Sequence, residues 1–129
     1  MRAVARKTFG LSHVVSIREH RVRVDAARAD GGEDSAPSPE ELLAASLASC
    51  AAMTIEMYAR RKGWELANVE VEVEYALAKR GAPTKYIVTL ALPTGLSDEE
   101  IARVRRVAAR CPVHRTLRSP AIFRERLAR

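Results

Sequence analysis

The sequence is poor in aromatic residues and cysteine, and it has no long uninterrupted apolar run. Aromatic residues make up 5% of the 129 residues, which argues against a surface that binds nucleic acid by stacking bases. Two cysteines are too few for the disulfide framework of a secreted scaffold. No apolar stretch reaches the roughly 18 residues of a membrane span, and residues 1–10 (MRAVARKTFG) lack the apolar core of a signal peptide. We therefore expect a cytoplasmic protein without a membrane partner.

The overall composition has the balance of an ordinary folded domain. The chain is 47% hydrophobic and 29% charged, which argues against disorder, and it is long enough to bury a core in a single domain over residues 1–129. The 22 Lys and Arg outnumber the 16 Asp and Glu, but they are spread along the chain and form no recognition motif. We expect a solvated, arginine-rich surface and no nucleic-acid partner; a basic nucleic-acid module is a third-ranked alternative.

Apolar residues alternate with polar ones in short segments on both sides of a long apolar stretch, and this alternation predicts antiparallel strands. The predicted strands are residues 14–18, 22–24, 69–75, 86–91 and 121–123. A capping box from Ser97 to Glu100 predicts a helix that ends near Cys111. The order of strands, long helix, strands and helix predicts an α+β fold with an antiparallel sheet.

The apolar stretch between the two groups of strands is predicted to be one long helix. Ser38 is a favourable N-cap, Pro39 fits the first helical position, and Glu41 completes a capping box. Gly63 is expected to end the helix. Residues 42–55 are apolar or small on every side, so we expect the helix to be buried all round at the centre of the fold.

The two cysteines differ in their local surroundings. Cys50 lies deep inside the predicted helix, where most cysteines are inert core residues and where the helix dipole is too distant to ionise a thiol. Cys111 precedes Pro112, so it would be an N-cap facing free backbone N–H groups and the more easily ionised thiol. A zinc site of Cys50, Cys111 and His114 is an alternative without the paired spacing of such sites, and we expect no cofactor.

Two segments resemble motifs of the OsmC/Ohr family. Residues 37–50 (PSPEELLAASLASC) resemble the family's first-cysteine helix, and residues 111–117 (CPVHRTL) resemble its second-cysteine motif. With the elements between them, the resemblance extends over residues 30–117. It implies an antiparallel β-sheet packed on two long central helices in an intertwined homodimer. It also implies an organic hydroperoxide reductase that acts in oxidative stress defence.

The resemblance implies a thiol cycle for the two cysteines. Cys50 would be the peroxidatic thiol, which attacks the O–O bond of a small organic hydroperoxide and becomes a sulfenic acid. Cys111 would be the resolving thiol, which converts that sulfenic acid to a disulfide. The family suggests a dithiol reductant such as a lipoyl protein. The alternative function is a non-enzymatic protein that binds a hydrophobic ligand or senses redox state.

The resemblance also implies a glutamate and an arginine at the same site. Glu40 matches the family's functional glutamate, and Arg28 is the only arginine in the loop before the helix; Arg21 or Arg18 could serve instead. Glu40 and Cys50 are ten residues apart on one helix, which is about 15 Å along its axis. If both residues serve one site, Glu40 must therefore come from the partner chain of the dimer.

Overall fold

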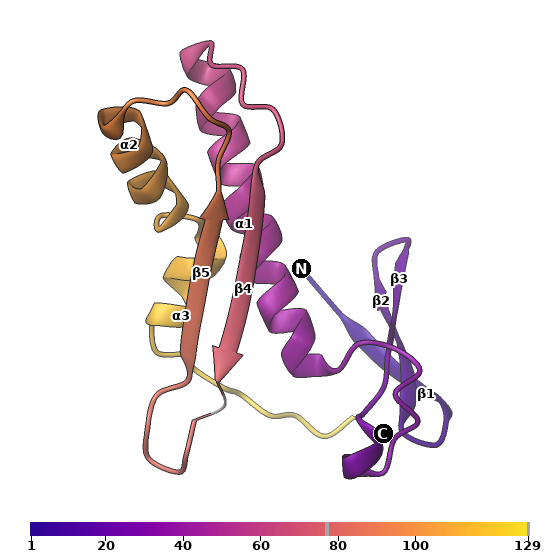
Figure 1. Ribbon diagram of the computed structural model, residues 1–129. Coiled ribbons are helices and arrows are strands. Elements are labelled where there is room, and N and C mark those ends of the chain that lie inside the picture. The colour runs from indigo at the N-terminus through magenta and orange to yellow at the C-terminus, as the bar shows by residue number, and fades with distance from the viewer. Residues whose placement is uncertain (77, 129) are drawn as a thin grey trace. The chain divides into compact units, whose positions relative to one another are not determined.

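The computed structural model describes residues 1–76 and 78–128, which form two compact units, Met1–Ala45 and Ser46–Arg129. Three strands are followed by a long helix, two further strands and two shorter helices (Figure 1). This order, with antiparallel pairing in both sheets, confirms the predicted α+β class. The expectation of one domain over residues 1–129 stays a prediction.

The first unit contains a three-stranded antiparallel sheet in the order β1-β2-β3. Its strands are β1 (Val4–Phe9), β2 (Ser12–Ile17) and β3 (His20–Val24). Alternation in the sequence predicts β2 and β3, and Val15 pairs with Val22 in their hairpin. The alternation does not predict β1, which pairs with β2 on the other side.

Helix α1 (Pro39–Lys62) begins and ends where the sequence predicts. The Ser38 Oγ accepts a hydrogen bond from the Glu41 N–H at 3.2 Å, and the Ser38 N–H donates to the Glu41 carboxylate at 3.0 Å. These two bonds form the predicted capping box, which satisfies backbone donors that the first helical turn leaves free. At the other end Gly63 has a φ of +70°, a left-handed conformation that suits glycine and stops the helix.

In the single chain, α1 buries one face and exposes the other. The buried side chains recur every four residues: Leu47, Ala51, Ile55 and Ala59. On the other side Leu43, Met53 and Met57 are 47%, 63% and 55% exposed. The expectation of burial on every side is therefore wrong for one chain, because a small sheet and two short helices can cover only one side of α1.

Helix α1 also meets the length and composition requirements of a membrane-spanning helix, with a mean hydropathy of 1.4 over 18 residues. The expectation that no segment is long and apolar enough is thus wrong on this criterion. Central helices of water-soluble proteins satisfy the same requirements, and α1 packs its Leu47–Ile55 stripe against the second unit's core. Its hydropathy therefore does not by itself indicate a membrane span.

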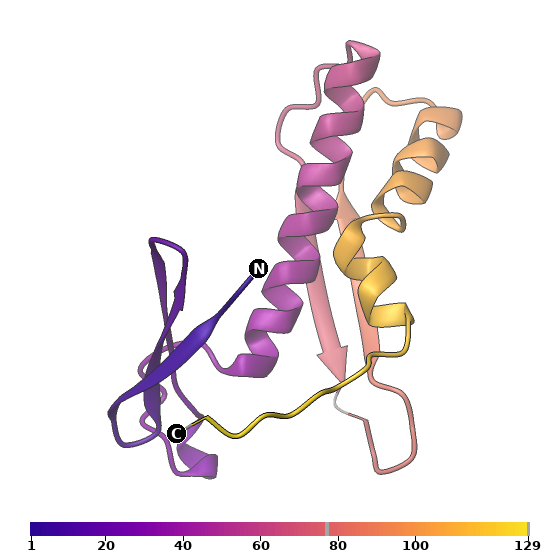
Figure 2. The ribbon, with the colours of Figure 1, turned by 180° about the vertical axis from the view of Figure 1, so that it is seen from behind.

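The second unit packs its helices on one face of a β-hairpin. The hairpin consists of β4 (Glu70–Ala76) and β5 (Lys85–Ala91), and the remaining helices are α2 (Asp98–Ala108) and α3 (Pro112–Arg118). Figures 1 and 2, seen from opposite sides, show α1, α2 and α3 on the same face of the two strands. Val71 and Val73 contact the helices while Glu70, Glu72 and Glu74 are exposed, as the alternation predicts.

Two buried clusters join these layers. Leu47 and Ala51 of α1 pack with Cys111, and Ile55 packs with Val104 and Ala108 of α2. The predicted capping box of α2 is present, with the Glu100 N–H donating to the Ser97 Oγ at 3.1 Å. The core of the second unit therefore lies between α1, the hairpin and the two short helices.

The predicted last strand at residues 121–123 is wrong. The chain from residue 120 to residue 128 has no helix or strand, and Ile122 and Phe123 are 89% and 85% exposed. A strand requires a neighbouring strand to accept and donate its backbone hydrogen bonds, and Pro120 has no N–H to donate. Local apolar character alone does not supply that neighbour.

Asp25 is the buried acid of the first unit and fixes the loop between β3 and α1. Its side chain is 3% exposed and accepts hydrogen bonds from the Ala26 N–H at 2.8 Å and the Ser35 hydroxyl at 2.6 Å. The N–H groups of Ser35 and Glu33 donate to the same carboxylate at 3.1 and 3.3 Å. These bonds, above all those from Ser35, lower the pKa of Asp25 from 3.8 to about 2.

We expect Asp25→Asn to destabilise the protein in a pH-dependent way. Because folding lowers the pKa of this carboxyl, its contribution to stability is complete above about pH 5 and is lost as the pH falls through 3.8 towards about 2. Urea unfolding from pH 7 to pH 3 should therefore show the largest gap between wild type and Asp25→Asn at neutral pH, and a narrowing gap in acid. Asp30→Asn, an exposed change in the same loop, is the control. A gap that stays constant down to pH 3 would contradict this role.

Candidate functional site

Cys50 and Cys111 come together in the second unit. Cys111 belongs to the buried cluster of Leu47 and Ala51, and Cys50 packs against that cluster from α1. The two thiols are close enough for Cys50 to raise the pKa of the Cys111 thiol, and both are free. Two residues far apart in the sequence therefore form one pair of thiols in an apolar environment.

Cys111 caps α3, but burial makes its thiol harder to ionise. Its Sγ accepts a hydrogen bond from the His114 N–H at 3.4 Å, which confirms the predicted N-cap. The residue is 0% exposed, and this burial raises the pKa of the Cys111 thiol despite that bond; the neighbouring Cys50 raises it further. The cap position therefore does not make the Cys111 thiol easy to ionise, contrary to the expectation from the sequence.

Cys50 is the more accessible member of the pair. It is half-buried, whereas Cys111 is fully buried. Its backbone is held in the helix, where its carbonyl also accepts a hydrogen bond from the Thr54 hydroxyl at 2.7 Å. A small molecule that approaches the pair from solvent therefore meets Cys50 first.

The described part of the chain does not assemble the zinc site considered as an alternative. Within residues 1–76 and 78–128, no group of three or more His, Cys, Asp or Glu side chains is placed to hold a metal ion. His114 follows Cys111 on α3, and its Nδ1 is buried without a hydrogen-bond partner among these residues. His114 contacts the Cys111 Sγ through the hydrogen bond from its backbone N–H.

The predicted arginine and glutamate both belong to the first unit. Arg28 begins a short 3-10 turn, Arg28–Asp30, and is exposed. Glu40 is exposed in the first turn of α1, and the capping box uses its neighbour Glu41 instead. The alternative arginines are also exposed, Arg18 in the β2–β3 turn and Arg21 in β3. The roles of these residues stay predictions.

Asp25 is a residue of this region that the sequence motifs do not reveal. Its carboxylate holds both ends of the loop that carries Arg28, through Ala26 and Ser35. The sequence does contain a signal for it: an Asp directly after a strand and before a loop rich in Gly, Asp and Ser favours side-chain-to-backbone turns. Asp25 is thus a structural support of the loop.

Solved structures share this fold. A Psychrobacter arcticus 273-4 protein named for osmotic stress induction and detoxification response is 24% identical, with a TM-score of 0.79 over 88% of this chain and 85% of that one. An organic hydroperoxide resistance protein from Legionella pneumophila is 25% identical, with a TM-score of 0.66 over 92% and 90%. A Vibrio cholerae protein described as an organic hydroperoxide resistance protein, with captopril bound in one of its active sites, is 24% identical, with a TM-score of 0.68 over 92% and 85%.

The sequence itself matches a family pattern over most of its length. The family model described as OsmC-like protein matches residues 31–125, which include both cysteines and the elements between them. No curated protein matches the sequence. The family match and the shared fold confirm the resemblance seen in the two cysteine motifs: the chain belongs to the OsmC-like protein family.

Proposed function

We propose that the protein is a thiol-dependent peroxidase that reduces organic hydroperoxides to alcohols through Cys50 and Cys111. The observation that carries this proposal is that Cys50 packs against the buried cluster that contains Cys111, with both thiols free. A relative of the same fold is named as an organic hydroperoxide resistance protein, which supports the same chemistry.

Cys50 is the thiol that attacks the peroxide. It is the accessible member of the pair, and the raised pKa of Cys111 keeps that buried thiol protonated at neutral pH. The Cys50 thiolate forms a bond to one peroxide oxygen while the O–O bond breaks, and the departing alkoxide takes up a proton to become the alcohol. Cys50 is thereby oxidised to a sulfenic acid.

Cys111 completes the oxidative half of the cycle. Its sulfur attacks the Cys50 sulfur, the S–S bond forms, and the sulfenic oxygen leaves as water with the proton of the Cys111 thiol. An external dithiol then reduces the disulfide and is itself oxidised, which restores both thiols. A buried resolving thiol suits this order, because it needs to reach only Cys50.

The apolar surroundings of the pair favour an organic peroxide as the substrate. Side chains packed around the cluster of Leu47, Ala51 and Cys111 include Val73, Tyr86 and Val88. Alkyl groups gain free energy by leaving water for such surroundings, at roughly 25 cal/mol per Å² of apolar area. Hydrogen peroxide has no apolar area to bury and gains nothing comparable.

A nearby cation and a second chain complete the proposed site. A thiol among apolar side chains needs a positive charge to ionise at neutral pH, and Arg28 is proposed for this role, with Glu40 orienting it. The exposed apolar side of α1, which includes Met53 and Met57, is proposed to pack against the same helix of a partner chain. Within one chain, Glu40 lies about 15 Å from Cys50 along the helix axis, so the Glu40 of each site would come from the partner chain.

We expect Cys50 to be essential for the first turnover and Cys111 to be dispensable for it. Attack needs one thiolate, whereas disulfide closure needs two sulfurs. With one equivalent of cumene hydroperoxide, Cys111→Ser should consume about one peroxide per chain and form the sulfenic acid. With excess peroxide, a second equivalent should over-oxidise Cys50 to the sulfinic acid, which mass spectrometry should show. The same assay with H₂O₂ should be slower.

Cys50→Ser is the matched variant and should consume no peroxide. Full single-turnover activity in this variant would reverse the two assignments. A wild-type protein that consumes no peroxide but binds a hydrophobic ligand tightly would favour the non-enzymatic alternative.

We expect the thiolate of Cys50 to depend on an arginine. In a Cys111→Ser background, Arg28→Ala should slow the alkylation of Cys50 by iodoacetamide at pH 7 about tenfold, because each unit of thiol pKa changes the thiolate fraction by that factor. Arg21→Ala and Arg18→Ala are the comparison variants. If one of them slows alkylation and Arg28→Ala does not, the placement at Arg28 is wrong and the other arginine takes its role.

We expect each active site to use residues from two chains. Glu40→Ala and Cys50→Ser homodimers should both be inactive, but a mixed dimer contains one site with both residues intact. Activity should therefore reappear when the two parents are unfolded and refolded together, at about half of the wild-type level per verified heterodimer. A folded monomer at micromolar concentration, or inactive heterodimers, would disprove the shared site.

A further inference from the structure

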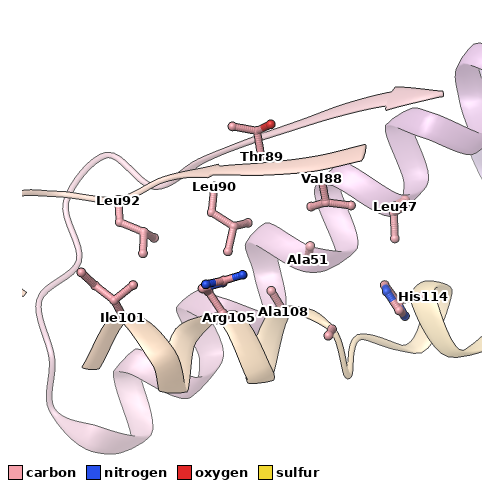
Figure 3. A pocket seen from close by; sticks show the side chains of 11 residues that line it. Leu47, Ala51, Val88, Thr89, Leu90, Leu92, Ile101, Arg105, Ala108 and His114 are labelled. Carbon is pink, nitrogen blue, oxygen red and sulfur yellow. The ribbon is translucent and has the colours of Figure 1, made fainter. Parts of the chain in front are cut away.

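The second unit contains an apolar cavity that borders the surroundings of the thiol pair and shares Leu47, Ala51 and Val88 with them. It has a volume of about 390 Å³ and lies where α1, β5 and α2 meet (Figure 3). Its apolar wall comes from these three elements and from the residue after β5: Leu47, Val88, Leu90, Leu92, Ile101 and Ala108. Neither cysteine lines it, and its volume lies near the lower end of the roughly 300–1,000 Å³ of small-molecule sites.

A single cation stands among these apolar side chains. Arg105 of α2 lines the cavity and is exposed at its edge, and Figure 3 draws its guanidinium between α2 and Leu90 in this view. No Asp or Glu is among the described residues that line the cavity, so no acid in its wall neutralises this charge. On the same helix, Arg103 is different, since it pairs with Glu99 at 2.8 Å outside the cavity.

From this combination we propose that the cavity binds a small amphipathic carboxylate, with the alkyl chain along the apolar wall and the carboxylate on Arg105. A guanidinium presents parallel N–H donors that match the two oxygens of a carboxylate. Covering a hydrocarbon chain removes apolar surface of the wall and of the ligand from water, which lowers the free energy. A small polar anion has no such surface to bury. Medium chain length follows from the small volume, and octanoate is the probe of this class.

This site is separate from the thiol pair, although the two are neighbours. His114 lines the cavity and donates its backbone N–H to the Cys111 Sγ. The proposed ligand contacts neither sulfur, and its binding needs no redox step. Octanoate binding should consequently persist in the Cys50→Ser variant, whether or not the protein reduces peroxides.

The experiment is a calorimetric titration of octanoate into the reduced, full-length protein. We expect saturable binding to wild type with a Kd below about 1 mM, and a loss of about tenfold or more in Arg105→Gln, which keeps most of the side chain but removes its charge. Arg103→Gln is the matched control on the same helix and should bind like wild type. Octanol has the same alkyl chain without the charge, so it should bind Arg105→Gln and wild type with the same Kd.

A second variant tests the cavity independently of charge. Ala109 lines the cavity at the end of α2 and is exposed, so Ala109→Leu should fill part of the space without burying a new group in the core. It should weaken octanoate and octanol alike, while circular dichroism stays that of wild type. No octanoate binding at about 10 mM, or binding that neither Arg105→Gln nor Ala109→Leu weakens, would overturn the proposal.

Discussion

The packing of one stripe of α1 against the hairpin and the short helices is the interaction on which the rest of the second unit depends. Leu47, Ala51 and Ile55 lie on a single side of the helix, and both buried clusters are built on them. Because Ala51 is small, the segment that carries Cys111 can approach α1 closely and pack its side chain against the helix. The closeness of the two thiols is therefore a result of core packing, and a change in that packing would alter the distance between them.

Features that depend on a few neighbouring residues could be predicted from the sequence. The capping boxes at Ser38 and Ser97 and the N-cap at Cys111 are local patterns, and the structure contains each of them. Strand β1 and the irregular segment at residues 121–123 could not be predicted in this way. Their states depend on whether a distant strand pairs with them, and alternation within the segment carries no information about that partner.

The candidate site shows the same limit. Sequence motifs identify Cys50 and Cys111, and the structure brings the two thiols together. The local pattern around Cys111 predicts easy ionisation, yet burial by residues of α1 and the hairpin outweighs the backbone hydrogen bonds at the cap. The burial of Asp25 likewise becomes visible only once Ser35 folds back onto it. Neighbouring residues in the sequence therefore predict local hydrogen bonds better than they predict how far a side chain is buried.

Cys111 is at once a core side chain, a helix cap and a thiol. Its sulfur is enclosed by Leu47 and Ala51 and held by the His114 N–H, so it has little room to rotate. Cys50 lies at the edge of the same cluster and is half-buried. If the two sulfurs form a covalent bond, the adjustment in side-chain torsion must come mainly from Cys50. Cys111 would then keep its position while the Cys50 side chain moves, so a disulfide could form without rearrangement of the core.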